Sequence, residues 1–197
     1  MTLVAGVLAV QGNVSEHVRA TERAADSSSD PIEIREIRSA GTLPDCDLLL
    51  APGGESTAIA RLVHEGGIAP EIRAHVTAGK PVLATCAGMI LLGRGNDDRV
   101  ETLDLLDVVV ERNAFGRQRD SFETALEVAG LDEPFPAVFI RAPAVTDSGD
   151  CEVLARVDGR PVAVRQGPIV ATAFHPELTD DRRVHRLALF ESTRVTQ

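Results

Sequence analysis

Three side chains in this sequence have the types and spacing of a nucleophile, a base and an acid that orients the base. Cys86 ends a short apolar run, Val82–Thr85, and precedes Ala87–Leu92, which we expect to start a helix. At a sharp turn before a helix, the backbone N–H groups and the helix dipole favour the thiolate form of a cysteine. His175-Pro176-Glu177 places a carboxylate two residues after an imidazole. These residues predict a catalytic triad if the fold brings them together.

The simpler interpretation of these residues is a buried structural cysteine and a surface histidine. An isolated Cys and an isolated His would favour it, but the turn at Cys86 and the paired Glu177 favour the triad. The other two cysteines, Cys46 and Cys151, have no such setting and form no metal-like pair. We therefore expect neither a disulfide framework nor a zinc site. Hydrolysis through a catalytic triad needs no metal or organic cofactor, so we expect none.

A glycine-rich turn, Pro52–Thr57, lies between a predicted strand and a predicted helix. Glycine lets the backbone approach a ligand closely and direct N–H groups at it. Taken alone, the segment would be an ordinary turn with Ser56 as the helix N-cap. Beside a thiolate nucleophile, the same N–H groups could form half of an oxyanion hole, and the N–H of Ala87 could form the other half.

Two arginines, Arg112 and Arg141, each follow the end of an apolar segment that predicts a strand. Either one could belong to a solvated loop. Two guanidinium groups at strand ends also fit the recognition of a small carboxylate, because the guanidinium group pairs with a carboxylate through two hydrogen bonds.

The elements that must position these residues alternate in the first half of the chain. Strands are expected at 3–10, 32–37, 47–51 and 82–85, and helices at 15–25 (capped by Ser15), 56–65, 70–78 and from 87 onward. This alternation predicts a parallel sheet with right-handed crossovers and helices on both faces. Ligands bind at the carboxyl ends of such strands, so Gln11, Gly53–Glu55 and Cys86 should share one rim.

The second half of the chain has more strand than helix. Strands are expected at 108–111, 121–128, 138–140, 151–157, 162–165 and 169–174, and a closing helix at 181–193. Asp158-Gly159 between two of these runs is a strong signal for a hairpin turn. No repeat, low-complexity tract or linker interrupts the chain, so we expect one domain over residues 1–197.

Composition and charge disfavour several kinds of partner. The 197 residues carry a formal net charge of −10, which argues against nucleic acid and anionic membranes. Lys80 is the only lysine. This acid excess with few lysines indicates a high-salt cytoplasm or a GC-rich genome that replaces Lys codons with Arg codons, and both can hold. Without a basic leader or a stretch long enough to span a bilayer, we expect a cytoplasmic protein.

Several segments spread over nearly the whole chain match one known family. They are Leu8–Gly12 with Glu16-His17, Pro52–Thr57, Thr85–Ile90, Val110–Gln118, Asp120–Glu123, Val138–Pro143 and Phe174–Thr179. On these segments the chain resembles the class I glutamine amidotransferases and, within them, the glutaminase subunits of pyridoxal 5′-phosphate synthase. The Cys turn and His-Pro-Glu mark the superfamily, whereas the Gly-Gly-Glu-Ser-Thr, Arg-Asn-Ala-Phe-Gly-Arg-Gln and Phe-Ile-Arg-Ala-Pro strings are more specific to the subfamily. Two mild departures are Ala84, where the family usually has Gly, and the unusually polar segment Gly93–Asp104.

The resemblance implies a three-layer α/β fold, flavodoxin-like, in which a mostly parallel central sheet carries helices on both faces. It implies hydrolysis of L-glutamine to L-glutamate and ammonia, with Cys86 as nucleophile, His175 as general acid/base and Glu177 as its orienter. The oxyanion N–H groups would come from Gly54 and Ala87. The residues implied to hold L-glutamine are Gly54, Glu55, Ser56, Arg112, Ile140 and Arg141.

The resemblance also implies a partner. Ammonia would pass to a separate synthase subunit that builds pyridoxal 5′-phosphate from a pentose phosphate and a triose phosphate, and Gln11 would lie near the interface with it. Two other classes stay open. One is a glutaminase subunit of a histidine or purine pathway, against which the subfamily strings argue. The other is a thiol redox sensor or chaperone of related fold, which has an acidic residue near the Cys turn and lacks His-Pro-Glu.

Overall fold

A central sheet of seven strands organises the molecule. The computed structural model describes residues 2–25, 31–95, 98–115 and 121–191. The strand order is β2-β1-β3-β4-β11-β10-β9, and the first five strands run parallel while β10 and β9 are antiparallel. Their bounds are β1 Leu3–Leu8, β2 Ile32–Ile37, β3 Leu48–Ala51, β4 Val82–Thr85, β9 Glu152–Val157, β10 Arg160–Gln166 and β11 Ile169–Thr172.

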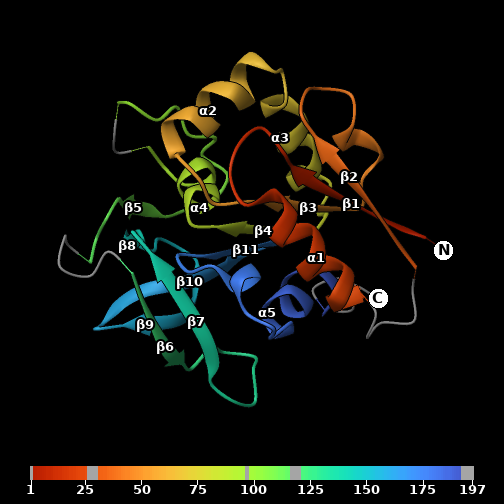
Figure 1. Cartoon of the computed structure of the whole chain (residues 1–197). Helices are drawn as coiled ribbons and strands as arrows, with labels where there is room; N and C mark the ends of the chain where they lie inside the picture. Colours follow the sequence, from red (N-terminus) through yellow and green to blue (C-terminus); the bar gives the residue numbers. More distant parts are fainter. Residues whose placement is uncertain (1, 26–30, 96–97, 116–120, 192–197) are drawn as a thin grey trace.

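Helices cover both faces of this sheet, as Figure 1 shows. One face carries α1 (Val14–Ala25) and the short α5 (Arg183–Arg186), which continues as the π-helical turn η4 (Leu187–Glu191). The other face carries α2 (Ser56–Glu65), α3 (Ala69–Thr77) and α4 (Ala87–Leu92). Each face has its own aliphatic core, and β3 contributes to both because its side chains alternate between the faces. The fold is therefore the three-layer, mostly parallel α/β arrangement that the sequence predicts.

Among the described residues, two small antiparallel sheets and two short 3₁₀ helices accompany the central sheet. The strands β5 (Val109–Glu111) and β8 (Ala144–Asp147) pair with each other, and β6 (Ser121–Leu126) pairs with β7 (Phe135–Ile140). The 3₁₀ helices are η1 (Leu43–Asp45) and η3 (Pro176–Leu178). No helix of the described part is both long and apolar enough to cross a membrane.

Most of the predicted elements are present, and the differences are local. The predicted strands 3–10, 121–128 and 169–174 end two residues earlier, and β7 begins three residues before the predicted 138. The Asp158-Gly159 turn joins β9 to β10 with positive φ at both residues, which confirms the hairpin. The closing helix begins two residues later than predicted and covers 183–191, and residues 192–193 of its predicted range lie outside the described residues.

The predicted helix cap at Ser15 is wrong, and so is the cap at Ser56 in the simpler interpretation of the glycine-rich turn. Helix α1 begins at Val14, so Ser15 lies inside its first turn, where its hydroxyl donates to the Glu16 carboxylate. Helix α2 is capped by Glu55 rather than Ser56, because the Glu55 carboxylate accepts from the N–H groups of Thr57 and Ala58. A glutamate is an uncommon cap, so the preference for serine at this position was misleading.

Candidate active site

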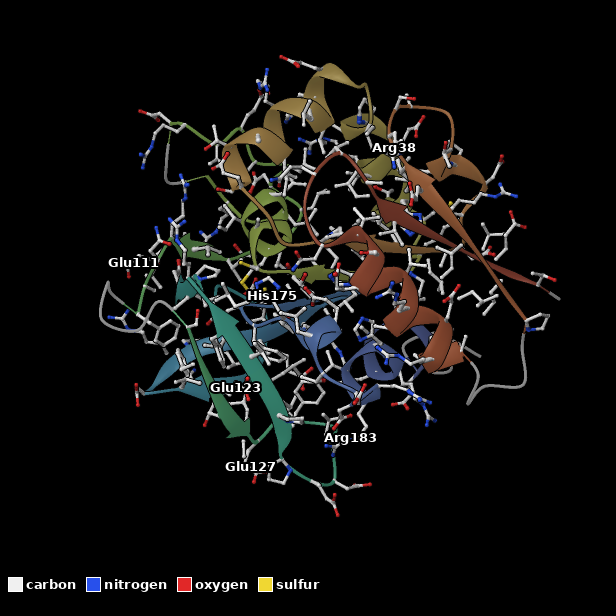
Figure 2. The ribbon with its side chains drawn as sticks, viewed as in Figure 1. Arg38, Glu111, Glu123, Glu127, His175 and Arg183 are labelled. Carbon is white, nitrogen blue, oxygen red and sulfur yellow. The ribbon has the colours of Figure 1, made fainter. Side chains whose placement is uncertain are left out.

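The predicted functional residues meet at the carboxyl ends of the parallel strands. Gln11 follows β1, Gly53 and Gly54 follow β3, Cys86 follows β4 and His175 follows β11. In Figure 2, the labelled His175 lies near the middle of the molecule, where these strands end. The shared rim that the alternation of strands and helices predicts is therefore present.

Cys86 lies at a strained turn between β4 and α4. Its backbone has φ 50° and ψ −106°, in a region that residues other than glycine rarely adopt. Its N–H donates to the Thr172 carbonyl at 2.7 Å, and its carbonyl accepts from Met89 N–H at 3.1 Å, within the first turn of the helix. A Cβ atom at Gly88 would lie 2.0 Å from the Ala51 carbonyl oxygen, so this close approach requires glycine. Such strain is typical of functional sites.

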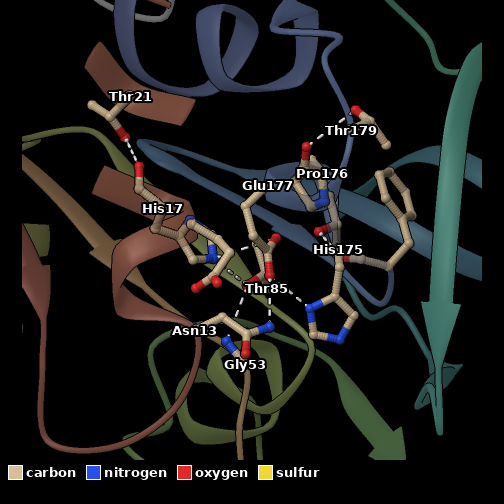
Figure 3. Close-up of polar contacts among 12 residues, drawn as sticks. Asn13, His17, Thr21, Gly53, Thr85, His175, Pro176, Glu177 and Thr179 are labelled. Carbon is tan, nitrogen blue, oxygen red and sulfur yellow. Dashed lines mark hydrogen bonds and ion pairs between the residues drawn. The ribbon is translucent and has the colours of Figure 1, made fainter. Parts of the chain in front are cut away.

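His175 and Glu177 form a buried pair on η3, shown in Figure 3. His175 Nδ1 lies 2.7 Å from Glu177 Oε1, and the two residues are 4% and 3% exposed. A carboxylate oxygen can only accept a hydrogen bond, so Nδ1 carries the proton. This imidazole and the nucleophile both pack against Gly53, since a Cβ at Gly53 would lie 2.6 Å from His175 Cε1 and 3.1 Å from Cys86 Cβ. The three predicted triad residues are therefore brought together.

The electrostatics of the pair favour opposite charges. Burial alone would lower the pKa of His175, but its interactions with Cys86 and Glu177 outweigh burial and raise the pKa to about 10. Burial would raise the pKa of Glu177, but His17 and His175 outweigh it and hold that pKa far below its usual range. At neutral pH, His175 is an imidazolium and Glu177 a carboxylate.

A cavity of about 330 Å³ opens beside Cys86 and His175. All of the residues predicted to bind the substrate line it, together with Ala87. The residues that line it and that the sequence did not single out are Asn13, Ile90, Asn113 and Pro143. Asn13 also contacts the triad, because its side-chain amide lies 3.3 Å from Glu177 Oε1. The sequence signal that could have identified Asn13 as a site residue is its position just after the Gln11-Gly12 turn, which follows a strand predicted to end at the active-site rim.

Charges of both signs line this cavity. Glu55, at the N-terminus of α2, lies 3.4 Å from the Arg112 guanidinium group, and Arg141, which follows β7, also lines the cavity. Burial would raise the pKa of Glu55, but the N–H groups of Ala58 and Thr57 and the charge of Arg112 lower it. The cavity therefore presents a carboxylate and two guanidinium groups near the cysteine.

Gln11 holds the glycine loop beside the cavity. Its side-chain oxygen Oε1 accepts from the Glu55 N–H at 2.9 Å. A Cβ atom at Gly54, whose φ is +154°, would lie 2.2 Å from the same oxygen. The backbone of Gly54 is thus in direct contact with Gln11, and no larger residue fits at position 54.

Comparisons with known proteins agree with this geometry. The model of the SNO glutamine amidotransferase family matches residues 7–193. The chain is 64% identical to the pyridoxal 5′-phosphate synthase subunit PdxT of Halobacterium salinarum, over all of this chain and 98% of that protein. It is 66% identical to the PdxT subunit of Haloarcula marismortui, over 98% of each chain.

Solved structures give the same result. A glutamine amidotransferase superposes with a TM-score of 0.83 at 46% identity, covering 93% of this chain and 95% of the other. The PurLQS structure from Thermotoga maritima shares the fold alone, with a TM-score of 0.64 at 18% identity over 93% of this chain and 92% of the other. The match over nearly the whole sequence, the fold and the arrangement around Cys86 lead to one conclusion: the chain belongs to the SNO glutamine amidotransferase family.

Proposed function

We propose that residues 1–197 form one glutaminase domain that hydrolyses L-glutamine to L-glutamate and ammonia. The observation that carries this proposal is the buried Cys86–His175–Glu177 arrangement at the wall of a cavity that also holds Glu55 and Arg112. A nucleophile, a base and an orienting acid are the groups that amide hydrolysis through a covalent intermediate requires.

The reaction begins with the Cys86 thiolate, which the His175 imidazolium stabilises. Its sulfur attacks the side-chain amide carbon of glutamine, and the backbone N–H groups of Gly54 and Ala87 stabilise the resulting oxyanion. His175 donates its proton to the departing ammonia, which leaves a glutamyl thioester. His175 then takes a proton from a water molecule that attacks the thioester, so that glutamate leaves and the thiolate is restored. Glu177 holds the imidazole in orientation throughout.

Substrate selection follows from the charges of the cavity. A free amino acid carries an ammonium group and a carboxylate, and each needs a partner of opposite charge when it leaves water. We assign the carboxylate of glutamine to Arg112 and Arg141 and its ammonium group to Glu55, with Ser56 and Ile140 as further contacts. A glutamine side chain within a protein lacks both charged groups and should be a poor substrate.

The ammonia serves a separate synthase subunit in the formation of pyridoxal 5′-phosphate. The support for this step is the high identity, over whole chains, with proteins named as the PdxT subunit of pyridoxal 5′-phosphate synthase. We place the complex in the cytoplasm, and Gln11 near the interface with the synthase subunit.

The test is ammonia release from L-glutamine by the chain together with its synthase subunit, in molar KCl. The complex should release ammonia and glutamate in equal amounts, and the Cys86→Ala complex should release none while remaining folded. Substantial turnover by a clean Cys86→Ala preparation would refute the triad, and absence of turnover by the unmodified complex would refute the glutaminase assignment.

A further inference from the structure

The Glu16-His17 pair belongs to the segments that carry the family resemblance, yet the mechanism above gives it no role. His17 is a fully buried residue of α1, and Figure 3 shows its ring beside Glu177 and Thr85. A buried imidazole is costly unless its polar atoms have partners. Nδ1 of His17 has no hydrogen-bond partner in the described part of the chain, so the groups around Nε2 indicate what His17 does.

The two oxygens of the Glu177 carboxylate have different partners. Oε1 lies close to His175 Nδ1 and to the side-chain amide of Asn13. Oε2 makes no hydrogen bond with the described residues, but it lies 3.4 Å from His17 Nε2 with both side chains wholly buried. His17 is thus the group that faces the second oxygen of the orienting acid.

The same nitrogen of His17 reaches the glycine loop through a hydroxyl group. His17 Nε2 lies 3.1 Å from Thr85 Oγ1, and that oxygen accepts from the Gly53 N–H, also at 3.1 Å. Because a carboxylate oxygen can only accept, the Nε2 atom that faces Glu177 carries a proton, and Thr85 Oγ1 receives hydrogen bonds from both His17 and Gly53. The N–H group at His17 Nε2 therefore contacts both the Glu177 carboxylate and the Thr85 hydroxyl, which holds the glycine loop.

We propose that His17 is a positioning residue of the glutaminase site, which fixes the Glu177 carboxylate and, through the Thr85 hydroxyl, the loop that carries Gly54. This inference rests on the proposed glutaminase activity. Without the His17 imidazole, Glu177 Oε2 would lose the charged or polar group that faces it at 3.4 Å, and the carboxylate would rotate or take up a proton. In either case His175 would lose its fixed orientation, and the turnover number would fall.

His185 offers a matched control. It is wholly buried on α5, its ring centre lies 5.7 Å from that of His17, and neither of its nitrogens has a hydrogen-bond partner in the described part of the chain. His185→Leu therefore removes a buried imidazole from the same layer without removing a donor to Glu177. Comparison with His17→Leu separates loss of packing from loss of the hydrogen-bond donor.

The experiment measures kcat and KM for glutamine, with the synthase subunit present, together with melting temperature. His17→Leu should lower kcat at least about tenfold with KM changed less than about threefold, because positioning acts on the transition state more than on binding. His17→Gln, which keeps an N–H donor of similar reach, should recover most of the loss. His185→Leu should keep kcat within about twofold of the unmodified protein. Should His17→Leu not fold, His17→Asn, whose amide is too short to reach Oε2, replaces it.

Three results would overturn the proposal: unchanged kcat in His17→Leu (or in His17→Asn), equal losses in the leucine and glutamine variants, or an equal loss in His185→Leu. Thr85→Val tests the contact of His17 with the Thr85 hydroxyl. An unchanged kcat in this variant would contradict the proposed link from His17 to the glycine loop and leave only its positioning of Glu177. The activity of the unmodified complex and the inactivity of Cys86→Ala report on the glutaminase assignment independently, so the two failures are distinguishable.

Discussion

At the scale of single residues, the pKa values of three buried histidines, His175, His185 and His75, shift in different directions. His175 has a carboxylate partner, and its pKa is raised to about 10. His185 and His75 are equally inaccessible, but burial dominates there and lowers their pKa values to about 3 and about 4. The imidazolium at the site therefore depends on Glu177 and Cys86, not on a general property of the interior.

These pKa shifts predict how stability depends on pH. Unfolded histidine has a pKa near 6.5, so between about pH 6.5 and pH 4 the unfolded chain takes up protons at positions 75 and 185 that the folded chain does not. Stability should fall as the pH drops through this window, by up to about 1.4 kcal/mol per pH unit for each imidazole. The contribution of His175 has the opposite sign, since it is complete below about pH 6.5 and is lost as the pH rises through about 10.

The measurement is urea unfolding at pH 7 and pH 5, at one KCl concentration. The free energy of unfolding should fall less between these pH values in His185→Leu and in His75→Leu than in the unmodified protein. Equal pH dependence in all three proteins would contradict the assignment of these two groups.

A second prediction at this scale concerns thiol reactivity. Burial raises the pKa values of Cys46 and Cys151, and neither faces the cavity, whereas Cys86 lines it beside an imidazolium. An electrophilic glutamine analogue at neutral pH should therefore label Cys86 alone, as measured by mass spectrometry of peptides. Prior incubation with L-glutamine should slow this labelling. Modification of Cys46 or Cys151 at a similar rate would contradict the assignment.

At the scale of elements, the sequence predicts best what depends on local pattern. The helix Ser56–Glu65 and the strand Val82–Thr85 have their predicted bounds, because an amphipathic period and a wholly apolar run identify them without tertiary contacts. Strand β8, Ala144–Asp147, was not predicted. It is four residues long, half of it is exposed, and it exists through pairing with β5. Such pairing has no signal in the strand itself.

The same distinction applies to the site. Cys86, His175 and Glu177 could be found because each lies in a short, chemically distinctive string. The contacts of Asn13 and His17 with Glu177 join α1 and its leading turn to η3 at the opposite end of the chain, and no local pattern encodes them. They follow from the parallel topology, which brings the carboxyl ends of β1 and β11 to one rim.

The contact between the β1–α1 turn and the glycine loop predicts how a partner could control the enzyme. Gln11 is exposed, yet its Oε1 atom accepts a hydrogen bond from the Glu55 N–H and packs closely against the backbone of Gly54. A synthase subunit that docks on Gln11 would act on the loop that supplies an oxyanion donor. The isolated chain should hydrolyse glutamine slowly, and the synthase should raise the rate by about tenfold or more, since a single oxyanion donor typically contributes about a hundredfold.

The measurement is steady-state ammonia release with and without the synthase, for the unmodified chain, Gln11→Ala and the control Ser15→Ala. Gln11→Ala should weaken activation more than it weakens folding. Ser15 is exposed in the first turn of α1, and its hydroxyl donates to Glu16, away from the glycine loop. The Ser15→Ala variant should therefore be activated normally. Equal rates with and without the synthase in the unmodified chain would exclude control of this kind, although not the triad itself.

At the scale of the whole molecule, the net charge of −10 is the dominant feature. Ion pairs such as Arg38 with Glu36 and Arg61 with Glu65 neutralise part of the acidic surface. Exposed pairs of this kind contribute only about 0–1 kcal/mol each, and salt weakens them. The excess carboxylates repel one another, and salt weakens that repulsion too. The response of stability to salt therefore shows which of the two effects is larger.

The high identity to haloarchaeal relatives favours the high-salt explanation of the acid excess. Raising KCl from about 0.1 M to about 1 M shortens the Debye length from about 10 Å to about 3 Å and so relieves repulsion between carboxylates. The melting temperature should therefore rise steeply with KCl into the molar range, despite the loss of ion pairs. Glu123→Gln with Glu127→Gln, which removes one exposed charge within β6 and one just after it, should raise the melting temperature in dilute buffer and make its salt dependence shallower. If instead the melting temperature is flat between dilute and molar KCl, repulsion does not limit stability, and replacement of Lys codons in a GC-rich genome explains the composition.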